Sequence, residues 1–270
     1  WQYTAALQAA GVKPGEVVIL ILQHSADLVY AYFGAILNGS IPSIMPFLTE
    51  KLLPERYRAD LAALFSVTQP EAVITYPEFE SEVRAITAQN TSVHAVLLTS
   101  QVTGSANPAD IRSAPGLQRQ PEDTVLLQHS SGTTGLQKGV ALTHRAVLNQ
   151  LTAYRQALSL SDQDVVVSWL PLYHDMGLIA GFLMPILSGV PLVLMSPFDW
   201  VRAPVRLLRA VSDYHGTLTW IPNFAYNFCA QKIRERDLAG IDLSSLRAVT
   251  NCSEPMRWES QQMFHQRFAA

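Results

Sequence analysis

The sequence predicts an α/β fold class, with two doubly wound, largely parallel β-sheet lobes flanked by helices. Two observations lead to this prediction. Short apolar runs rich in β-branched residues alternate with helix-like patterns along nearly the whole chain, and such alternation indicates right-handed βαβ crossovers in a parallel sheet. The first run, 17–22, is continuously apolar, as in strands buried on both faces. No repeat with a period of about 20 to 50 residues is found, so a solenoid is excluded.

Turn and cap residues delimit the elements expected in the first part of the chain. Gly11 is suited to end a helix, Pro14-Gly15 to form a turn, Ser25 to cap a helix, and Pro54 to occupy the first turn of another. The expected helices are 1–11, 25–38, 54–67 and 78–88, and the expected strands are 17–22, 41–45, 72–75 and 93–98.

Residues 100–121 are rich in Ser, Gly, Pro and Asn and lack periodicity, which is typical of a linker. We therefore expect a first lobe at 1–99, a linker at 100–121 and a second lobe at 122–270. The α/β alternation continues in the second lobe. Its expected strands are 124–129, 165–169, 191–195, 217–220 and 246–250, and its expected helices are 144–158, 177–187, 204–214, 223–236 and one beginning near 256.

Composition narrows the possible function classes. The chain has 270 residues, 49% of them hydrophobic, with 19 Lys and Arg against 22 Asp and Glu, for a net charge of −3. The large hydrophobic fraction argues against intrinsic disorder. The slightly negative net charge argues against a nucleic-acid partner. Because Cys229 and Cys252 are the only cysteines, no disulfide framework is expected, and a cytoplasmic location is the default. The uncharged stretch 179–196 contains interrupting Gly and Pro residues, so we expect no membrane span there.

The most informative segment follows the strand expected at 124–129. It runs from Ser130 to Gly139 as SSGTTGLQKG and combines hydroxyl side chains, glycines and a lysine. Glycines let backbone N–H groups converge on one point, hydroxyls add donors, and a lysine supplies the charge that a polyphosphate needs. It is not a Walker A loop, because the Gly-Lys-Ser/Thr ending is absent. A polar surface loop is the alternative, but one of only four lysines in the chain, Lys138, lies here.

Several further segments, in order, resemble one known family. They are GVKPGEVVILILQHSADLVYAYFGAILNGSIPSIMPF, SSGTTGLQKGV, LTHRAVLNQ and SWLPLYHDMGLIAGFLMPILSGVPLVLM. Together they resemble the adenylate-forming superfamily, which includes acyl-CoA synthetases, acyl-AMP ligases and the adenylation domains of peptide synthetases. PLYHDMGL, WIPNFAYNF and NCSEPM are most similar to its fatty-acyl-AMP ligase branch. The resemblance covers almost the whole chain.

This resemblance implies roles for the residues around the phosphate segment. Lys138 would contact the outgoing pyrophosphate, and His174 would lie where the carboxylate meets the α-phosphate. A capping or core histidine is the alternative for His174. Gln137 stands where many relatives have proline. The residues that would hold the ATP phosphates, together with Lys138, are Ser130, Ser131, Gly132, Thr133, Thr134 and Gly135.

The resemblance also implies an acyl pocket and an adenine-side turn. Trp220, Asn223, Phe224 and Met176 would line the acyl pocket, although plain core packing is the commoner fate of aromatic residues. The adenine side would be formed by Ser253, Glu254 and Pro255.

Cys252 and Ser253 depart from the family pattern, because relatives usually have Gly and Ala at these two positions. We expect Cys252 to cost backbone freedom there and to narrow the turn. Arg202, Arg206 and Arg209 have helical spacing and would make one basic stripe. We interpret it as a solvated helix face, and more weakly as a docking site for a carrier protein or coenzyme A.

The activity implied is ATP-dependent activation of a carboxylic acid, above all a fatty acid, to acyl-AMP with release of pyrophosphate. Transfer to a thiol of an acyl carrier protein or of CoA would follow. ATP and Mg²⁺ would be the cofactors. The Mg²⁺-binding Glu, the ribose-binding Asp and the small C-terminal domain with its catalytic Lys are expected beyond Ala270. The chain would then be a truncated N-terminal domain with little or no activity alone.

Two other function classes stay open at this stage. One is an NTPase or phosphotransferase that uses the glycine-rich segment differently, with Asp175 as its metal-binding acid. The other is a non-catalytic nucleotide-binding or interaction module. None of the seven histidines shows metal-ligand spacing, so no protein-held metal site is expected. The sequence does not indicate the acyl chain length or the thiol acceptor.

Overall fold

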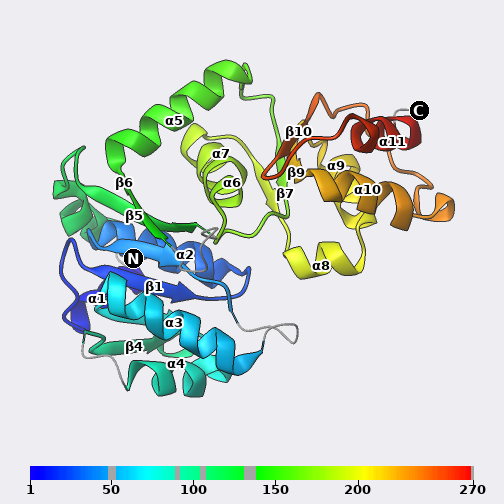
Figure 1. The fold of residues 1–270 in the computed structure, drawn as a ribbon. Helices are drawn as coiled ribbons and strands as arrows, with labels where there is room; N and C mark the ends of the chain where they lie inside the picture. The colour runs from blue at the N-terminus through cyan, green and yellow to red at the C-terminus, as the bar shows by residue number, and fades with distance from the viewer. Residues whose placement is uncertain (48–52, 89–91, 104–107, 131–137, 269–270) are drawn as a thin grey trace. The chain divides into compact units, whose positions relative to one another are not determined.

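The computed structural model describes residues 1–47, 53–88, 92–103, 108–130 and 138–268 (Figure 1). Backbone contacts divide the chain into two compact units, Trp1–Val147 and Leu148–Ala270. Each unit contains a parallel sheet with helices around it, which confirms the predicted α/β fold class. None of the helices in the described ranges is long and apolar enough to cross a bilayer.

The first unit is built on a parallel sheet of four strands in the order β2-β1-β3-β4. The central strands are wholly or almost wholly buried, and this explains why their sequences read as continuous apolar runs. Val17 pairs with Ile41, and Ala72 pairs with Ala95. The strands are β1 (Val17–Ile21), β2 (Ile41–Ile44), β3 (Ala72–Thr75) and β4 (Ala95–Leu98).

Two helices of the first unit begin where the cap residues predict. The Ser25 hydroxyl accepts a hydrogen bond from the Leu28 N–H at 3.4 Å and so caps α2. Pro54 starts α3, whose residue Phe65 is fully buried in the core between helices and sheet. The helices are α1 (Gln2–Ala9), α2 (Ala26–Leu37), α3 (Pro54–Thr68) and α4 (Glu80–Thr87), with a short 3₁₀ turn η1 (Pro77–Phe79) before α4.

The segment expected to be a linker is attached to the first unit. It contains three 3₁₀ turns, η2 (Thr99–Gln101), η3 (Pro108–Ser113) and η4 (Pro115–Gln118). Gly116 lies so close to the end of α2 that a Cβ there would be 2.1 Å from the Ile36 carbonyl oxygen. The division between the units falls inside α5 (His144–Ala157) instead of at 100–121.

A two-stranded antiparallel hairpin follows this segment. It pairs β5 (Thr124–Ser130) with β6 (Lys138–Thr143). The sequence pattern predicts β5 but not β6, because a short strand directly after a glycine-rich segment resembles a continuation of the loop. The hairpin packs beside β2, and this contact keeps it in the first unit.

The second unit contains another parallel sheet, in the order β10-β9-β7-β8. Figure 1 shows α6 and α7 on one side of this sheet and α9 and α10 on the other. The strands are β7 (Val166–Ser168), β8 (Leu192–Leu194), β9 (Leu218–Pro222) and β10 (Ala248–Cys252). The helices are α6 (Asp175–Leu178), a π-helical turn η5 (Ile179–Leu183), α7 (Met184–Ser188), α8 (Pro197–Arg202), α9 (Val205–Tyr214), α10 (Asn223–Lys232) and α11 (Trp258–Phe268), with a short 3₁₀ turn η6 (Glu235–Asp237) after α10.

The expectation of one basic stripe on a single helix is wrong. Arg202 ends α8, whereas Arg206 and Arg209 lie on α9. Ala203, with φ −145° and ψ 81°, leaves the helical conformation before Pro204, because a helical backbone is disfavoured before a proline, and this separates the two helices. Arg206 lies 3.4 Å from an Asp199 carboxylate oxygen, and Arg209 donates to the Asp237 carbonyl at 3.4 Å.

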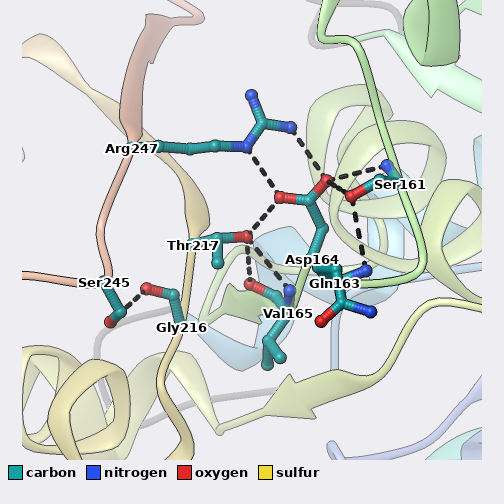
Figure 2. Close-up of polar contacts among 8 residues, drawn as sticks. All are labelled: Ser161, Gln163, Asp164, Val165, Gly216, Thr217, Ser245 and Arg247. Carbon is teal, nitrogen blue, oxygen red and sulfur yellow. Dashed lines mark hydrogen bonds and ion pairs between the residues drawn. The ribbon is translucent and has the colours of Figure 1, made fainter.

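A polar network joins the amino ends of three strands in the second sheet (Figure 2). Asp164 precedes β7, Thr217 precedes β9 and Arg247 precedes β10. The Asp164 carboxylate accepts from Arg247 Nε at 2.7 Å and Nη2 at 3.0 Å, from the Thr217 hydroxyl at 2.7 Å and from the Ser161 N–H at 2.8 Å. The Arg247 guanidinium holds the pKa of Asp164 well below its usual range. The network therefore joins the strands at their amino ends. Parallel α/β sheets bind ligands at the other edge, where the carboxyl ends of the strands lie.

Candidate functional site

The predicted phosphate segment connects the two strands of the hairpin. Ser130 and Lys138 are the last facing pair, so both ends of the segment are fixed by backbone pairing. Ser131, Gly132, Thr133, Thr134 and Gly135 lie outside the described residues. Their roles, and those of the Ser130 and Lys138 side chains, stay predictions.

One residue beside this segment was not singled out from the sequence. His129 is buried, faces Gly139 across the hairpin, and has no hydrogen-bond partner on either ring nitrogen among the described residues. A Cβ at Gly139 would lie 3.5 Å from His129 Cε1, so the ring lies against the glycine backbone. Burial lowers the pKa of His129 and favours the neutral ring.

His174 occupies the N-cap position of α6, but its side chain does not act as a cap. Its backbone is extended, its side chain is exposed, and it makes no capping hydrogen bond to the described residues. Asp175 contributes the local polar contact instead, because its Oδ1 accepts from the Met176 N–H at 2.7 Å. Desolvation by neighbouring atoms lowers the pKa of His174, and Asp175 partly opposes this shift. His174 is therefore not a capping histidine, because its side chain makes no capping bond to the described residues, and it is not a core histidine, because it is exposed.

The residues predicted to line the acyl pocket differ in exposure. Trp220 on β9 is only 1% exposed, whereas Phe224 on α10 is 50% exposed. Met176 on α6 is half-buried, and its sulfur accepts a hydrogen bond from the Tyr154 hydroxyl at 3.8 Å. Trp220 is therefore part of the packed interior, and Phe224 is open to solvent.

Asn223 begins α10 and joins three elements. Its Oδ1 accepts from the Arg257 N–H at 2.9 Å and from Asn251 Nδ2 at 3.2 Å, and its Nδ2 donates to the Ser260 hydroxyl at 3.1 Å. The side chain is buried. Asn223 thus connects the carboxyl ends of β9 and β10 to α11, a positioning role that the sequence did not reveal.

Phe224 is held by a backbone contact and by aromatic neighbours. Its N–H donates to Glu254 Oε1 at 2.6 Å, and its ring meets Trp169 and Trp200 edge-on at centroid distances of 6.4 and 6.1 Å. The two indoles stack at 3.6 Å with an angle of 8° between their planes. The sequence alone does not indicate this stack, because nothing in the spacing of Trp169 and Trp200 shows that they meet.

The predicted adenine-side residues form the turn after β10. Glu254 accepts from the first turn of α10, where a carboxylate also interacts favourably with the helix dipole. Cys252 ends β10 in the sheet, and Ser253 takes the left-handed conformation with φ 68°. The expected cost in backbone freedom therefore falls on Ser253 and not on Cys252. Burial raises the pKa of the Cys252 thiol, which favours its neutral form.

Comparison with protein families gives a match over nearly the full length. The family model described as AMP-binding enzyme matches residues 2–270.

Curated relatives that resemble this chain include two kinds of fatty-acid ligase. The medium-chain-fatty-acid acyl-carrier-protein ligase TtuA of Teredinibacter turnerae is 34% identical over 151 residues, which are 56% of this chain and 24% of that protein. The long-chain-fatty-acid AMP ligase FadD26 of Mycobacterium bovis is 29% identical over 261 residues, which are 95% of this chain and 44% of that protein. The chain thus spans less than half the length of these relatives.

Solved structures share the fold. The fatty acyl-adenylate ligase from L. pneumophila, in complex with acyl adenylate and pyrophosphate, matches 99% of this chain and 45% of its own with a TM-score of 0.84 and 29% identity. The structure of McyG A-PCP complexed with phenylalanyl-adenylate matches this chain with a TM-score of 0.88 and 21% identity. At this identity the likeness concerns the fold alone.

Proposed function

Because this chain belongs to the family of AMP-binding enzymes, we propose that it carries the phosphate-binding and acyl-binding part of an enzyme that activates a fatty acid with ATP. The products would be acyl-AMP and pyrophosphate. The observation that carries this proposal is the match of 99% of the chain, at 29% identity, to a ligase whose structure holds both of these products.

The proposed reaction needs positioning more than acid or base catalysis. A carboxylate oxygen attacks the α-phosphorus of ATP, the new bond forms there, and the bond from that phosphorus to the bridging oxygen of pyrophosphate breaks. No proton moves, because the carboxylate is already ionised at neutral pH. The rate then depends on holding the reactants in line and on stabilising the negative charge that grows on the leaving phosphates.

Several of the predicted residues have distinct parts in this scheme. The Lys138 ammonium would balance charge on pyrophosphate, and the hydroxyls and N–H groups of 130–135 would donate to phosphate oxygens. His174, exposed at the start of α6, would donate to the oxygens between carboxylate and α-phosphate. Asn223 and Glu254 would keep the ends of β9, β10 and α10 in register beside the acyl group.

Mg²⁺ would accompany the ATP phosphates. Within the described ranges, no group of three or more His, Cys, Asp or Glu side chains could hold a metal ion.

The proposed acceptor of the acyl group is a thiol, on an acyl carrier protein or on CoA. The name of the Teredinibacter turnerae relative supports the carrier protein. We propose the cytoplasm as the location, because both cysteines are buried free thiols, which suits a reducing compartment.

Binding of a stable acyl-AMP mimic tests the proposal directly. Isothermal titration calorimetry of the 270-residue chain with octanoyl-sulfamoyl adenosine should show binding that Lys138→Ala and His174→Ala weaken, with Lys13→Ala as the matched control. Undetectable binding would count against the proposed site. In a separate assay, ATP–pyrophosphate exchange by this chain alone should be near background. Measurable exchange would show that residues 1–270 suffice for acyl-AMP formation.

A further inference from the structure

We propose that an arginine cluster on the second unit docks the acidic face of a carrier protein, the thiol acceptor of the acyl group. The cluster consists of Arg209, Arg234 and Arg236 around Asp237. This inference rests on the proposed function, because it names the partner that would receive the acyl group and favours the carrier protein over CoA.

The three arginines come from two segments that meet at η6. On α9 the apolar residues are buried, and Arg209 is left exposed on the other side of the helix. Arg234 and Arg236 follow the end of α10, where Ile233 is buried, and their side chains are 65% and 71% exposed. Arg209 Nη2 donates to the Asp237 carbonyl at 3.4 Å, and this bond joins α9 to η6.

Asp237 is shared by all members of the cluster. Its Oδ2 accepts from Arg234 Nε at 3.0 Å, and its Oδ1 lies 3.9 Å from Arg236 Nε. The hydrogen bond from Arg234 lowers the pKa of Asp237, which therefore stays ionised. Glu235, the other acid of this turn, lies 3.4 Å from Arg267 on α11. Because three guanidinium groups share one carboxylate, the cluster carries excess positive charge, although the whole chain is net negative.

Stability does not account for this arrangement. Exposed ion pairs contribute little to the free energy of unfolding, and a single arginine would satisfy the carboxylate. Further like charges repel one another. The shared anchor does provide order, because arginines that are already held in place lose less side-chain entropy when an external carboxylate binds. Each guanidinium has five N–H donors, of which Arg209 and Arg234 each give one to Asp237.

The chemistry of the cluster favours a protein partner that bears carboxylates. The guanidinium fork binds a carboxylate through two parallel hydrogen bonds, and arginine is enriched at protein interfaces. A site for a small molecule such as CoA is usually concave and buries most of the ligand. The exposure of Arg234 and Arg236 instead describes an open surface. The name of the Teredinibacter turnerae relative also supports a carrier protein.

The cluster lies away from the edge that we propose holds the acyl group. α10 begins at that edge with Asn223 and extends for ten residues, about 15 Å, before the cluster is reached. A partner docked at the cluster can deliver a thiol to the edge only on a long arm. Docking and acyl-AMP binding should therefore be separable by substitution.

The docking step is tested with an acidic acyl carrier protein in its apo form, which lacks the prosthetic arm. In calorimetric titrations, the wild-type 270-residue chain should bind it at low ionic strength and lose affinity at about 0.5 M salt, where charges are screened. The double variant Arg234→Gln/Arg236→Gln should bind about tenfold more weakly. The matched control is Arg56→Gln/Arg84→Gln, which removes two exposed, ion-paired arginines of the first unit and should keep wild-type affinity.

Two further probes separate the alternatives. Octanoyl-sulfamoyl adenosine should bind the wild type and the Arg234→Gln/Arg236→Gln variant equally. No carrier binding by the wild type, or equal carrier affinity in that variant, would overturn the inference and leave the proposed function standing. CoA binding that this variant loses would make the cluster a CoA site and also overturn the inference. Failure of octanoyl-sulfamoyl adenosine to bind the wild type would overturn the proposed function instead.

Discussion

The amino edge of the second sheet and its carboxyl edge use polar side chains in different ways. At the amino edge, Asp164, Thr217 and Arg247 satisfy one another in a closed network around one carboxylate. At the carboxyl edge, Asn223 and Glu254 bond to backbone groups of neighbouring turns and so fix the positions of other residues. The contrast distinguishes an edge whose polar groups serve stability from an edge that we propose serves a binding site, and substitutions at the two edges should differ in the same way.

The largest expected effect is on stability at the amino edge. Asp164→Ala removes the buried acceptor of several hydrogen bonds, whereas the half-exposed Arg247 can be hydrated after the change. We expect a loss of about 2–3 kcal/mol in the free energy of unfolding, measured by urea denaturation. Binding of octanoyl-sulfamoyl adenosine by the remaining folded protein should stay unchanged. A selective loss of binding would mean that the two edges are not separate in function.

The same carboxylate predicts a pH dependence. The pKa of Asp164 is lowered in the folded state, so its stabilisation is complete above the ordinary Asp pKa of about 4. It is lost as the pH falls further, toward the folded-state pKa. Wild-type stability should therefore decline more steeply below pH of about 4 than that of Asp164→Ala, as thermal unfolding at a series of pH values would show. Parallel curves would contradict this.

At the carboxyl edge, Glu254→Ala should affect binding more than stability. It removes the acceptor of the Phe224 N–H at the exposed start of α10, which costs about 1 kcal/mol of stability. Because Phe224 is predicted to line the acyl pocket, affinity for octanoyl-sulfamoyl adenosine should fall, and Glu254→Gln should recover part of it. Equal affinity in Glu254→Ala and the wild type, by calorimetry, would show that this cap does not position Phe224 for a ligand.

Local patterns in the sequence predicted most strands and helices, because apolar runs and caps act over a few residues. Ser25 and Pro54 begin their helices as expected. α8 was not expected either, although Ser196 and Pro197 are local signals for its start. Two other differences depend on contacts distant in sequence. β6 exists through pairing with β5, and the attachment of 100–121 depends on the close approach of Gly116 to α2.

The site was predicted less completely than the fold. Resemblance supplied candidate residues such as His174 and Trp220, but it did not indicate which of them are open to solvent. The stack of Trp169 on Trp200 and the three-way contact of Asn223 join side chains from separate elements. No spacing within one segment encodes such contacts, because tertiary packing brings the partners together.

The smallest expected effect concerns the backbone at the carboxyl edge. Ser253 has φ 68°, a left-handed conformation that is strained for residues other than glycine. Ser253→Gly relieves this strain but increases the conformational entropy of the unfolded chain, so the net change in unfolding free energy should be a gain of less than about 0.5 kcal/mol.

The reverse change gives a matched control for Ser253→Gly. Gly189 ends α7 with φ 70°, and a Cβ there would have no atom within 4 Å, so Gly189→Ser isolates the same backbone strain without a steric clash. It should destabilise the second unit by about 1 kcal/mol in urea denaturation. A clear loss of stability in Ser253→Gly would mean that the Ser253 side chain contributes to the turn. The carboxyl edge would then depend on its side chains for stability, as the amino edge does.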